Sequence, residues 1–281
     1  MGGIGGLNEI ADLFDVAVLD QWGVLHDGTT PYPHAAAALL ALRSAGKGIA
    51  VLSNSGRRAD ANRARIAACG LPVETIDVVV TSGDALWHDV ESGRLGLARP
   101  FAIEAAPGDA RRWAEGLPVS IAPRVEEADA LLVMGLRDDA TTADHEGELT
   151  VALARDLPLV CSNPDHLSPR HDGAPLAQPG ALAAAYAARG GRTSWYGKPH
   201  APIFEAVARV FPGVPPERFV MVGDSPEHDI RGGRAARWRT VLVRGGLHAA
   251  NLLDGDDPAV AAVCARHGAP FPDHHMRWLA P

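Results

Sequence analysis

VAVLDQWGVLHDG, residues 16–28, is the stretch that decides the fold. Its opening residues, Val16–Leu19, form an uninterrupted apolar run with the length of a buried strand. The run ends on Asp20, and Gly23 and Gly28 punctuate the turns that follow. The carboxyl ends of the strands form the ligand-binding edge of an open parallel sheet, so this pattern predicts a functional carboxylate there. Capping of the next turn is the alternative role for a single Asp.

Apolar runs and helix-like segments alternate beyond this stretch. Ala35–Ala45 is rich in alanine and leucine and predicts a helix, and Gly48–Leu52 predicts a second buried strand. Strands that alternate with helices are typical of a parallel sheet. Further strands of this same sheet are predicted at Asp77–Val80, Thr193–Tyr196, Phe219–Val222 and Thr240–Val243, of which the last would complete it. The His274-His275 pair near the end of the chain is predicted to lie at the surface.

Residues 85–180 have more loop breakers and shorter apolar runs than the rest of the chain. Ala130–Met134 and Leu157–Val160 are examples, and helix-like segments such as Glu146–Arg155 separate them. The predicted fold class is therefore α/β, with a parallel-sheet core and a smaller α/β domain inserted into it. We place the discontinuous core domain at 1–84 and 181–281 and the inserted domain at 85–180.

Polar groups with complementary chemistry follow four predicted strands. They are Asp20, the pair Ser53 and Asn54, Lys198, and Asp224 together with Asp229. A parallel sheet brings these ends to one edge, where clustered carboxylates repel unless a hard cation such as Mg²⁺ lies among them.

These groups together describe a site for phosphoryl transfer. Lys198 supplies a positive charge beside a bound dianion, and Ser53 is predicted at a helix start, where free backbone N–H groups favour anions. Asp20 has the chemistry to attack phosphorus and form an aspartyl-phosphate. Taken alone, Asp224 has helix capping as an alternative role, and Lys198-Pro199 has the alternative of a surface turn.

Composition excludes several classes of protein. The formal net charge is −8 and no long basic run occurs, which argues against nucleic acid as a main partner. No apolar run reaches the roughly 18 residues of a membrane span, and no secretory signal pattern opens the sequence. The three cysteines share no metal-type spacing, and their odd number favours a reducing compartment. We therefore expect a cytoplasmic protein, and a homo-oligomer is compatible with this sequence.

The chain resembles class IIA of the haloacid dehalogenase (HAD) superfamily, the NagD-like and nitrophenylphosphatase-like branch. The resemblance covers nearly the full length. Its motifs are DQWGVLHDG at 20–28, LSNS at 52–55, YGKPH at 196–200 and VGDSPEHDIRGG at 222–233, with VTSGDA at 80–85 and CSNPDH at 161–166 as stretches specific to the branch.

The resemblance implies a Rossmann-like core with an α/β cap between the second and third motifs, and hydrolysis of a small phosphorylated metabolite. It implies Mg²⁺ bound by Asp20, the carbonyl of Trp22 and Asp224, with Asp229 nearby. Ser53, Asn54 and Lys198 are then the candidates for phosphate binding, and Asn163 and Asp165 would lie on a cap loop that faces the substrate.

One departure from the family pattern concerns the general acid. The superfamily's first motif is usually Asp-x-Asp, but Trp22 stands at the second Asp position. Loss of a general acid costs about 10²–10⁴-fold in rate. Three interpretations stay open: the substrate has a good leaving group; another residue donates the proton, with His26 nearest in sequence unless it is a turn residue bonded locally; or the protein binds a phosphorylated ligand without turnover. Dehalogenase or phosphonate chemistry is a fourth, remoter possibility.

Overall fold

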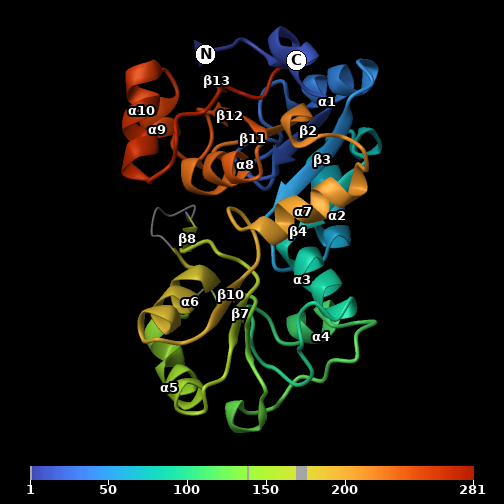
Figure 1. Ribbon diagram of the computed structural model, residues 1–281. Helices are drawn as coiled ribbons and strands as arrows, with labels where there is room; N and C mark the ends of the chain where they lie inside the picture. Colours follow the sequence, from blue (N-terminus) through green and yellow to red (C-terminus); the bar gives the residue numbers. More distant parts are fainter. Residues whose placement is uncertain (1, 138, 169–175) are drawn as a thin grey trace. The chain divides into compact units, whose positions relative to one another are not determined.

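The deciding stretch forms β2 (Val16–Asp20), a strand whose residues are all buried. The computed structural model describes residues 2–137, 139–168 and 176–281. The chain divides into two compact units (Figure 1). Unit 1 comprises Met1–Ser53, Ala59–Val80 and Lys198–Pro281, and unit 2 comprises Asn54–Arg58 and Thr81–Gly197.

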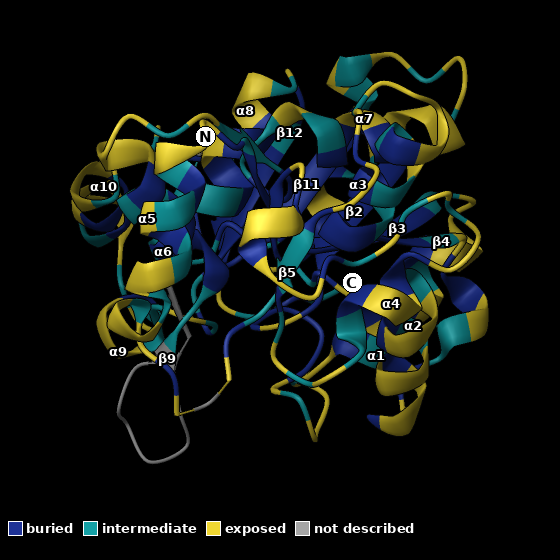
Figure 2. Ribbon diagram, turned by 90° about the horizontal axis from the view of Figure 1, so that it is seen from below, coloured by how far each residue is buried: buried dark blue, intermediate teal, exposed yellow. Residues whose placement is uncertain are grey.

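Within the described residues, unit 1 is organised around a seven-stranded sheet with the order β1-β13-β12-β11-β2-β3-β4. Besides β2, its strands are β1 (Gly2–Gly3), β13 (His274–Met276), β12 (Arg239–Val243), β11 (Phe219–Gly223), β3 (Gly48–Ser53) and β4 (Val78–Thr81). The pairs from β1 through to β3 are all parallel. Figure 2 shows β2, β3 and β11 as buried strands, which agrees with their nearly continuous apolar sequences.

The register of the sheet brings three strand ends to one level. Leu19 of β2 pairs with Val51 of β3 and with Val222 of β11. Asp20 therefore lies level with Leu52 and Gly223. Ser53 follows Leu52 and Asp224 follows Gly223, so both residues lie at the same edge of the sheet as Asp20. The parallel strands thus place Asp20, Ser53 and Asp224, three of the polar residues predicted from the sequence, at one edge of the sheet.

Helices cover both faces of this sheet because alternate strand residues point to opposite sides. On one face, Ala17 and Leu19 share a core cluster with Leu39 of α1 (Ala35–Ser44) and with Ile66 of α2 (Ala59–Ala68). On the other face, Leu242 packs with α9 (Ala249–Leu252) and α10 (Asp257–Arg266). The other helical elements of unit 1 are η1 (Leu7–Leu13), η2 (Val73–Thr75), α7 (Ala201–Val210), η5 (Pro216–Arg218), η6 (Pro226–Ile230) and α8 (Arg231–Ala235).

Unit 2 has its own core around a four-stranded parallel sheet. The strand order is β10 (Thr193–Trp195), β7 (Leu159–Cys161), β6 (Leu131–Val133) and β5 (Phe101–Ile103). A short antiparallel pair, β8 (Leu167–Ser168) and β9 (Leu176–Ala177), accompanies it. Its helical elements are α3 (Ser82–Glu91), α4 (Asp109–Trp113), η3 (Val125–Glu127), η4 (Thr142–His145), α5 (Glu146–Ala154) and α6 (Pro179–Ala188). The predicted fold class, a parallel α/β core with a second α/β unit inserted in the chain, is confirmed.

Two predictions about the first sheet are wrong. The strand predicted at Thr193–Tyr196 exists as β10, but it pairs with β7 in the sheet of unit 2. The first sheet also does not end with β12, because β13 and β1 extend it. His275 of β13 is buried rather than exposed, and its Nε2 atom lies 2.7 Å from Oδ1 of Asp257.

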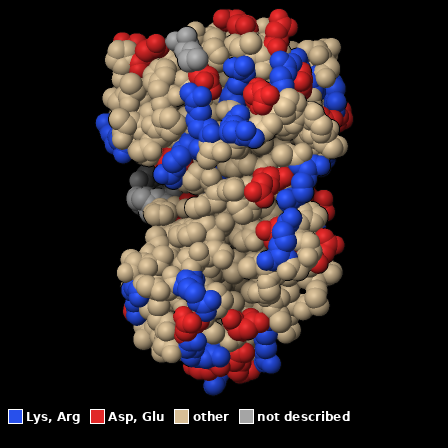
Figure 3. All heavy atoms as spheres, viewed as in Figure 1, with Lys and Arg blue, Asp and Glu red and all other residues tan. Residues whose placement is uncertain are grey.

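The helices and the surface charge bear on whether a membrane or a nucleic acid is a partner of this protein. No helix in the described ranges has both the length and the apolar character needed to cross a lipid bilayer. On the face that Figure 3 presents, Lys and Arg side chains are interspersed with Asp and Glu side chains.

Candidate active site

Lys198 joins two buried carboxylates in unit 1. Its Nζ atom donates to Oδ1 of Asp20 at 2.6 Å and to Oδ1 of Asp229 at 2.7 Å. Oδ1 of Asp20 also accepts the backbone N–H of Gln21 at 2.8 Å. Asp229 is completely buried and Lys198 is 3% exposed, so water screens this ion pair weakly. The two donors fix the orientation of the Asp20 carboxylate.

Asp224 completes a group of three carboxylates. Asp20, Asp224 and Asp229 each offer an oxygen atom, and these atoms all lie within 4.8 Å of one another. The backbone N–H of Leu247 donates to Oδ2 of Asp224 at 2.6 Å. Helix capping at this turn is carried out by Ser225, whose hydroxyl oxygen accepts the N–H of His228. The side chain of Asp224 therefore belongs to the carboxylate group.

The electrostatics of this group favour a divalent cation. Three carboxylates face one ammonium, which leaves excess negative charge in a buried place. Burial raises the pKa of Asp20 to about 7, against the effect of Lys198 and with the help of the Asp229 charge. Burial, followed by the charges of Asp20 and Asp229, holds the pKa of Asp224 well above its usual value. Clustered oxygen ligands with unbalanced negative charge suit Mg²⁺, so the residues present fit that ion.

Glycines allow the carboxylates to approach the backbone. A Cβ atom on Gly23 or Gly246 would overlap Oδ2 of Asp224, and one on Gly223 would overlap the carboxylate of Asp229. Gly246 and the backbone donor of Leu247 were not predicted from the sequence. The available signal was the Gly245-Gly246 pair shortly after β12, because paired glycines after a strand often mark a close backbone approach.

Ser53 and Trp22 flank the position of Asp20. Ser53 is the last residue of β3 and is buried, one residue beyond the partner of Asp20 in the register. The prediction that Ser53 lies at a helix start is wrong, because α2 begins at Ala59. The side chain of Trp22 is 47% exposed, and the guanidinium of Arg65 lies 5.7 Å from its ring centroid.

His26 is a fully buried member of the loop that follows β2. Its Nδ1 atom accepts the N–H of Gly28 at 2.9 Å, and its Nε2 atom faces the side-chain amide of Gln21 at 3.1 Å. Burial, reinforced by the charge of Arg65, lowers the pKa of His26 to about 4. The ring is therefore neutral near pH 7 and is held by its own loop, which favours a role in the turn over proton donation.

The remaining predicted residues lie together in unit 2. The side-chain amide of Asn54 donates to Oδ1 of Asp165 at 2.8 Å. Asn163 accepts the N–H of Asp165 through its Oδ1 atom at 3.0 Å. The structure thus groups Asn54 with Asn163 and Asp165 in unit 2, whereas the other five residues of the predicted strand-end set lie in unit 1.

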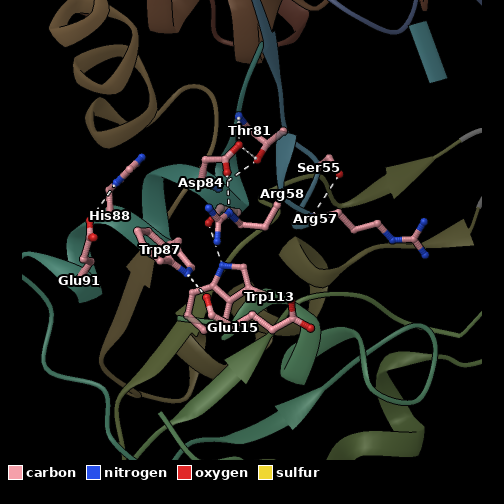
Figure 4. Close-up of polar contacts among 11 residues, drawn as sticks. Ser55, Arg57, Arg58, Thr81, Asp84, Trp87, His88, Glu91, Trp113 and Glu115 are labelled. Atoms are coloured by element: carbon pink, nitrogen blue, oxygen red, sulfur yellow. Dashed lines mark hydrogen bonds and ion pairs between the residues drawn. The ribbon is translucent and has the colours of Figure 1, made fainter. Parts of the chain in front are cut away.

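The segment Asn54–Arg58 is held in unit 2 by contacts with the start of α3 (Figure 4). Nε of Arg58 donates to Oδ1 of Asp84 at 2.8 Å, and its guanidinium lies 4.3 Å from the ring centroid of Trp87. Asp84 also forms a capping box with Thr81. The first point at which the chain passes from unit 1 to unit 2 therefore lies between Ser53 and Asn54, inside the LSNS motif.

Two family models match parts of this chain. The family model described as Haloacid dehalogenase-like hydrolase matches residues 17–98, and the model described as HAD-hydrolase-like matches residues 195–266. Chronophin from Rattus norvegicus is 30% identical over 242 residues, which cover 82% of this chain and 76% of chronophin. The chain belongs to the HAD-like hydrolases.

Solved structures of this family share the fold. A HAD-like hydrolase from Brucella suis is 30% identical and has a TM-score of 0.83, with 99% of this chain and all of that chain covered. p-Nitrophenyl phosphatase from Archaeoglobus fulgidus is 22% identical with a TM-score of 0.75, covering 94% and 96% of the two chains. The resemblance to class IIA of the HAD superfamily is confirmed, and the chain is a HAD-like hydrolase.

Proposed function

We infer that this HAD hydrolase is a Mg²⁺-dependent phosphatase that cleaves a small phosphorylated metabolite through an aspartyl-phosphate on Asp20. The observation that carries the proposal is the buried group of Asp20, Asp224 and Asp229 around Lys198. A nucleophilic carboxylate, a fixed cation and two further acidic groups are the parts that phosphoryl transfer needs.

The chemistry follows from these side chains. An oxygen of the Asp20 carboxylate attacks phosphorus, and the bond between phosphorus and the ester oxygen of the substrate breaks. Water then cleaves the aspartyl-phosphate, which releases inorganic phosphate and restores Asp20. Lys198 balances charge that builds on the phosphoryl oxygens. When bound by Asp20, Asp224, Asp229 and the carbonyl of Trp22, Mg²⁺ would offset the negative charge of the phosphoryl group.

The predicted binding residues receive two separate roles in this proposal. We assign Ser53 and Asn54 to the phosphoryl group, because a hydroxyl and an amide at the end of β3 supply neutral donors. Asn163 and Asp165 are assigned to recognition of the rest of the substrate. Asn163 accepts the backbone N–H of Asp165, and the Asp165 side chain accepts from Asn54, which supports this role by fixing their orientation.

Trp22 limits the substrates that this site can use well. Its indole has no titratable proton near pH 7, and His26 is neutral and engaged in its loop. The leaving oxygen must therefore depart with little help from a protein acid. The proposal accordingly favours phosphate esters of acidic hydroxyl groups, for which protonation of the leaving group matters least.

The test compares Asp20→Asn with Asp27→Asn on p-nitrophenyl phosphate in the presence of Mg²⁺. Asp27 is an exposed residue of the same loop, so its variant controls for handling and folding. Loss of phosphate release in Asp20→Asn, with retention in Asp27→Asn, supports the proposal. Equal release by Asp20→Asn and the wild-type protein would refute a nucleophilic role for Asp20.

Trp22 also supports a second candidate function, a regulatory protein that binds a phosphorylated ligand without turnover. The indole of Trp22, two residues after Asp20, is exposed and so suits ligand contact, while no acid stands at that position. In that case phosphorylated metabolites would raise the melting temperature and would be recovered intact. Release of phosphate from those same ligands would exclude this function.

A further inference from the structure

A second group of metal-ligating side chains lies in unit 1 and has no role in the chemistry above. It consists of Glu227 in η6, His248 at the start of α9 and His267 at the end of α10. The three residues come from separate elements of the chain, yet their ligand atoms all lie within 4.8 Å of one another. We refer to them as the Glu-His-His group.

The side chains of this group converge on one carboxylate oxygen. Nδ1 of His267 lies 3.3 Å from Oε2 of Glu227, and Nε2 of His248 lies 4.0 Å from the same atom. The two imidazole rings are tilted against each other, with their centroids 4.7 Å apart. Bond lengths of about 2.0–2.2 Å from Zn²⁺ to such ligands place tetrahedral donor atoms roughly 3.3–3.5 Å apart. The group needs small side-chain movements to reach that geometry.

Two atoms at the centre of the group lack hydrogen bonds. Oε2 of Glu227 and Nε2 of His248 are buried, and neither has a hydrogen-bond partner among the described residues. A buried polar atom without a partner costs about 1–3 kcal/mol. A cation between the three side chains would satisfy both atoms at once.

The donor chemistry indicates which cation would bind. Two imidazole nitrogens and one carboxylate oxygen form a mixed set that suits Zn²⁺ and related transition metals, whereas Mg²⁺ and Ca²⁺ prefer oxygen ligands. Three protein ligands also leave a fourth position for water.

The group is connected to the candidate active site through two segments. His248 directly follows Leu247, whose N–H donates to Asp224. Glu227 lies in η6 together with Asp229. We propose that Glu227, His248 and His267 bind a transition-metal ion, with Zn²⁺ favoured, which holds the loop before α9 against η6 and so supports the position of Asp224.

The experiment measures zinc binding by the full chain after metal removal, with Mg²⁺ kept saturating. Calorimetry gives the stoichiometry and affinity for Zn²⁺, and Co²⁺ absorption reports whether nitrogen ligands surround the ion. The variants are His267→Gln, His248→Gln and Glu227→Gln. His88→Gln is the matched control, because His88 forms a surface pair with Glu91 at 3.3 Å and no third ligand joins them within the described part of the chain.

We expect the wild-type protein to bind one zinc ion per chain and to show a zinc-dependent rise in melting temperature. Each of the three variants of the Glu-His-His group should bind Zn²⁺ at least tenfold more weakly. His88→Gln should bind like the wild-type protein, and so should Asp224→Asn, which removes a ligand of the other group. Wild-type zinc affinity in both histidine variants would overturn the proposal. Zinc binding that is lost in Asp224→Asn but kept in His267→Gln would also overturn it, because the ion would then occupy the aspartate group.

Discussion

The Nζ atom of Lys198 lies 2.6 Å from Oδ1 of Asp20, although 178 positions separate the two residues in the chain. Both belong to unit 1, yet Lys198 follows β10, a strand of unit 2. The ion pair thus depends on the last segment of unit 1, which begins at Lys198 shortly after that strand. Because the pair is buried, its loss should affect stability as well as activity.

Substitution of Lys198 tests this dependence. In Lys198→Met, the carboxylates of Asp20 and Asp229 keep their burial and lose their shared cation. Removal of one partner from a buried ion pair typically costs about 3–5 kcal/mol, so we expect a loss of that size in the free energy of unfolding near pH 7. Added Mg²⁺ should stabilise the variant more than the wild-type protein, since it restores positive charge.

Denaturant unfolding with and without Mg²⁺ measures this effect. Arg99→Met is the control, because Arg99 and Glu127 form an exposed pair at 2.7 Å, for which about 0.5 kcal/mol is expected. A loss below about 1 kcal/mol in Lys198→Met would contradict the assigned electrostatic role.

The glycine beside Asp224 gives a second prediction. A Cβ atom at Gly246 would overlap Oδ2 of Asp224, so Gly246→Ala should displace that carboxylate from the group. We expect the affinity for Mg²⁺ to fall at least about tenfold, since the displaced oxygen is a proposed ligand. Gly96→Ala is the control, because nothing lies within 4 Å of a Cβ atom there. Unchanged Mg²⁺ affinity in a Gly246→Ala protein with wild-type stability would speak against Asp224 as a ligand.

Substitution of Trp22 tests the missing general acid. Trp22→Asp supplies a carboxylic acid where the indole stands, and Trp22→Asn changes the size without supplying an acid. Because a general acid contributes about 10²–10⁴-fold, Trp22→Asp should raise kcat/KM for an alkyl phosphate such as glycerol phosphate by about 10²-fold or more. Activity on p-nitrophenyl phosphate should change far less, since its leaving group needs no proton. Equal gains in the two variants would show that space, rather than acid catalysis, limits the reaction.

Much of the fold was predictable because the strands of unit 1 are continuous apolar runs. Val16–Leu19 and Phe219–Val222 are apolar throughout and lie within β2 and β11. Asp20 follows the first run directly and Asp224 follows the second run after Gly223, so the chain order alone placed these carboxylates at one edge. Parallel pairing then brings the strand ends together without further information from the sequence.

Sheet membership of β10 was not predictable in this way. The strand has three residues, Thr193–Trp195, which are partly buried, and its local pattern fits either sheet. Its pairing with Leu159–Cys161 depends on long-range packing. Burial of His275 depends in the same way on a distant partner, because Asp257 supplies the hydrogen bond that makes a buried imidazole tolerable. The contact from Leu247 to Asp224 uses a backbone donor, which leaves no side-chain signal.

His26 gives a prediction about the pH dependence of stability. Burial lowers its pKa in the folded protein to about 4, from an ordinary value of 6.5. The unfolded chain therefore binds more protons than the folded chain between these two pH values, and the free energy of unfolding rises with pH across that window. The stability that this neutral ring contributes is complete above about pH 6.5 and is lost as the pH falls toward 4. One such group contributes a slope of up to about 1.4 kcal/mol per pH unit.

His26→Asn separates this contribution from those of other histidines. Asparagine has no titration in this range, and its side-chain oxygen can accept the N–H of Gly28 in place of Nδ1. The variant should be less stable near pH 7, because the smaller side chain leaves space in a fully buried position. Its stability should also fall less steeply between pH 6.5 and 4 than that of the wild-type protein, as measured by urea unfolding at several pH values. Parallel curves of stability against pH for the two proteins would mean that His26 has the same pKa in the folded and unfolded chains. That result would contradict the lowered pKa of His26 in the folded protein.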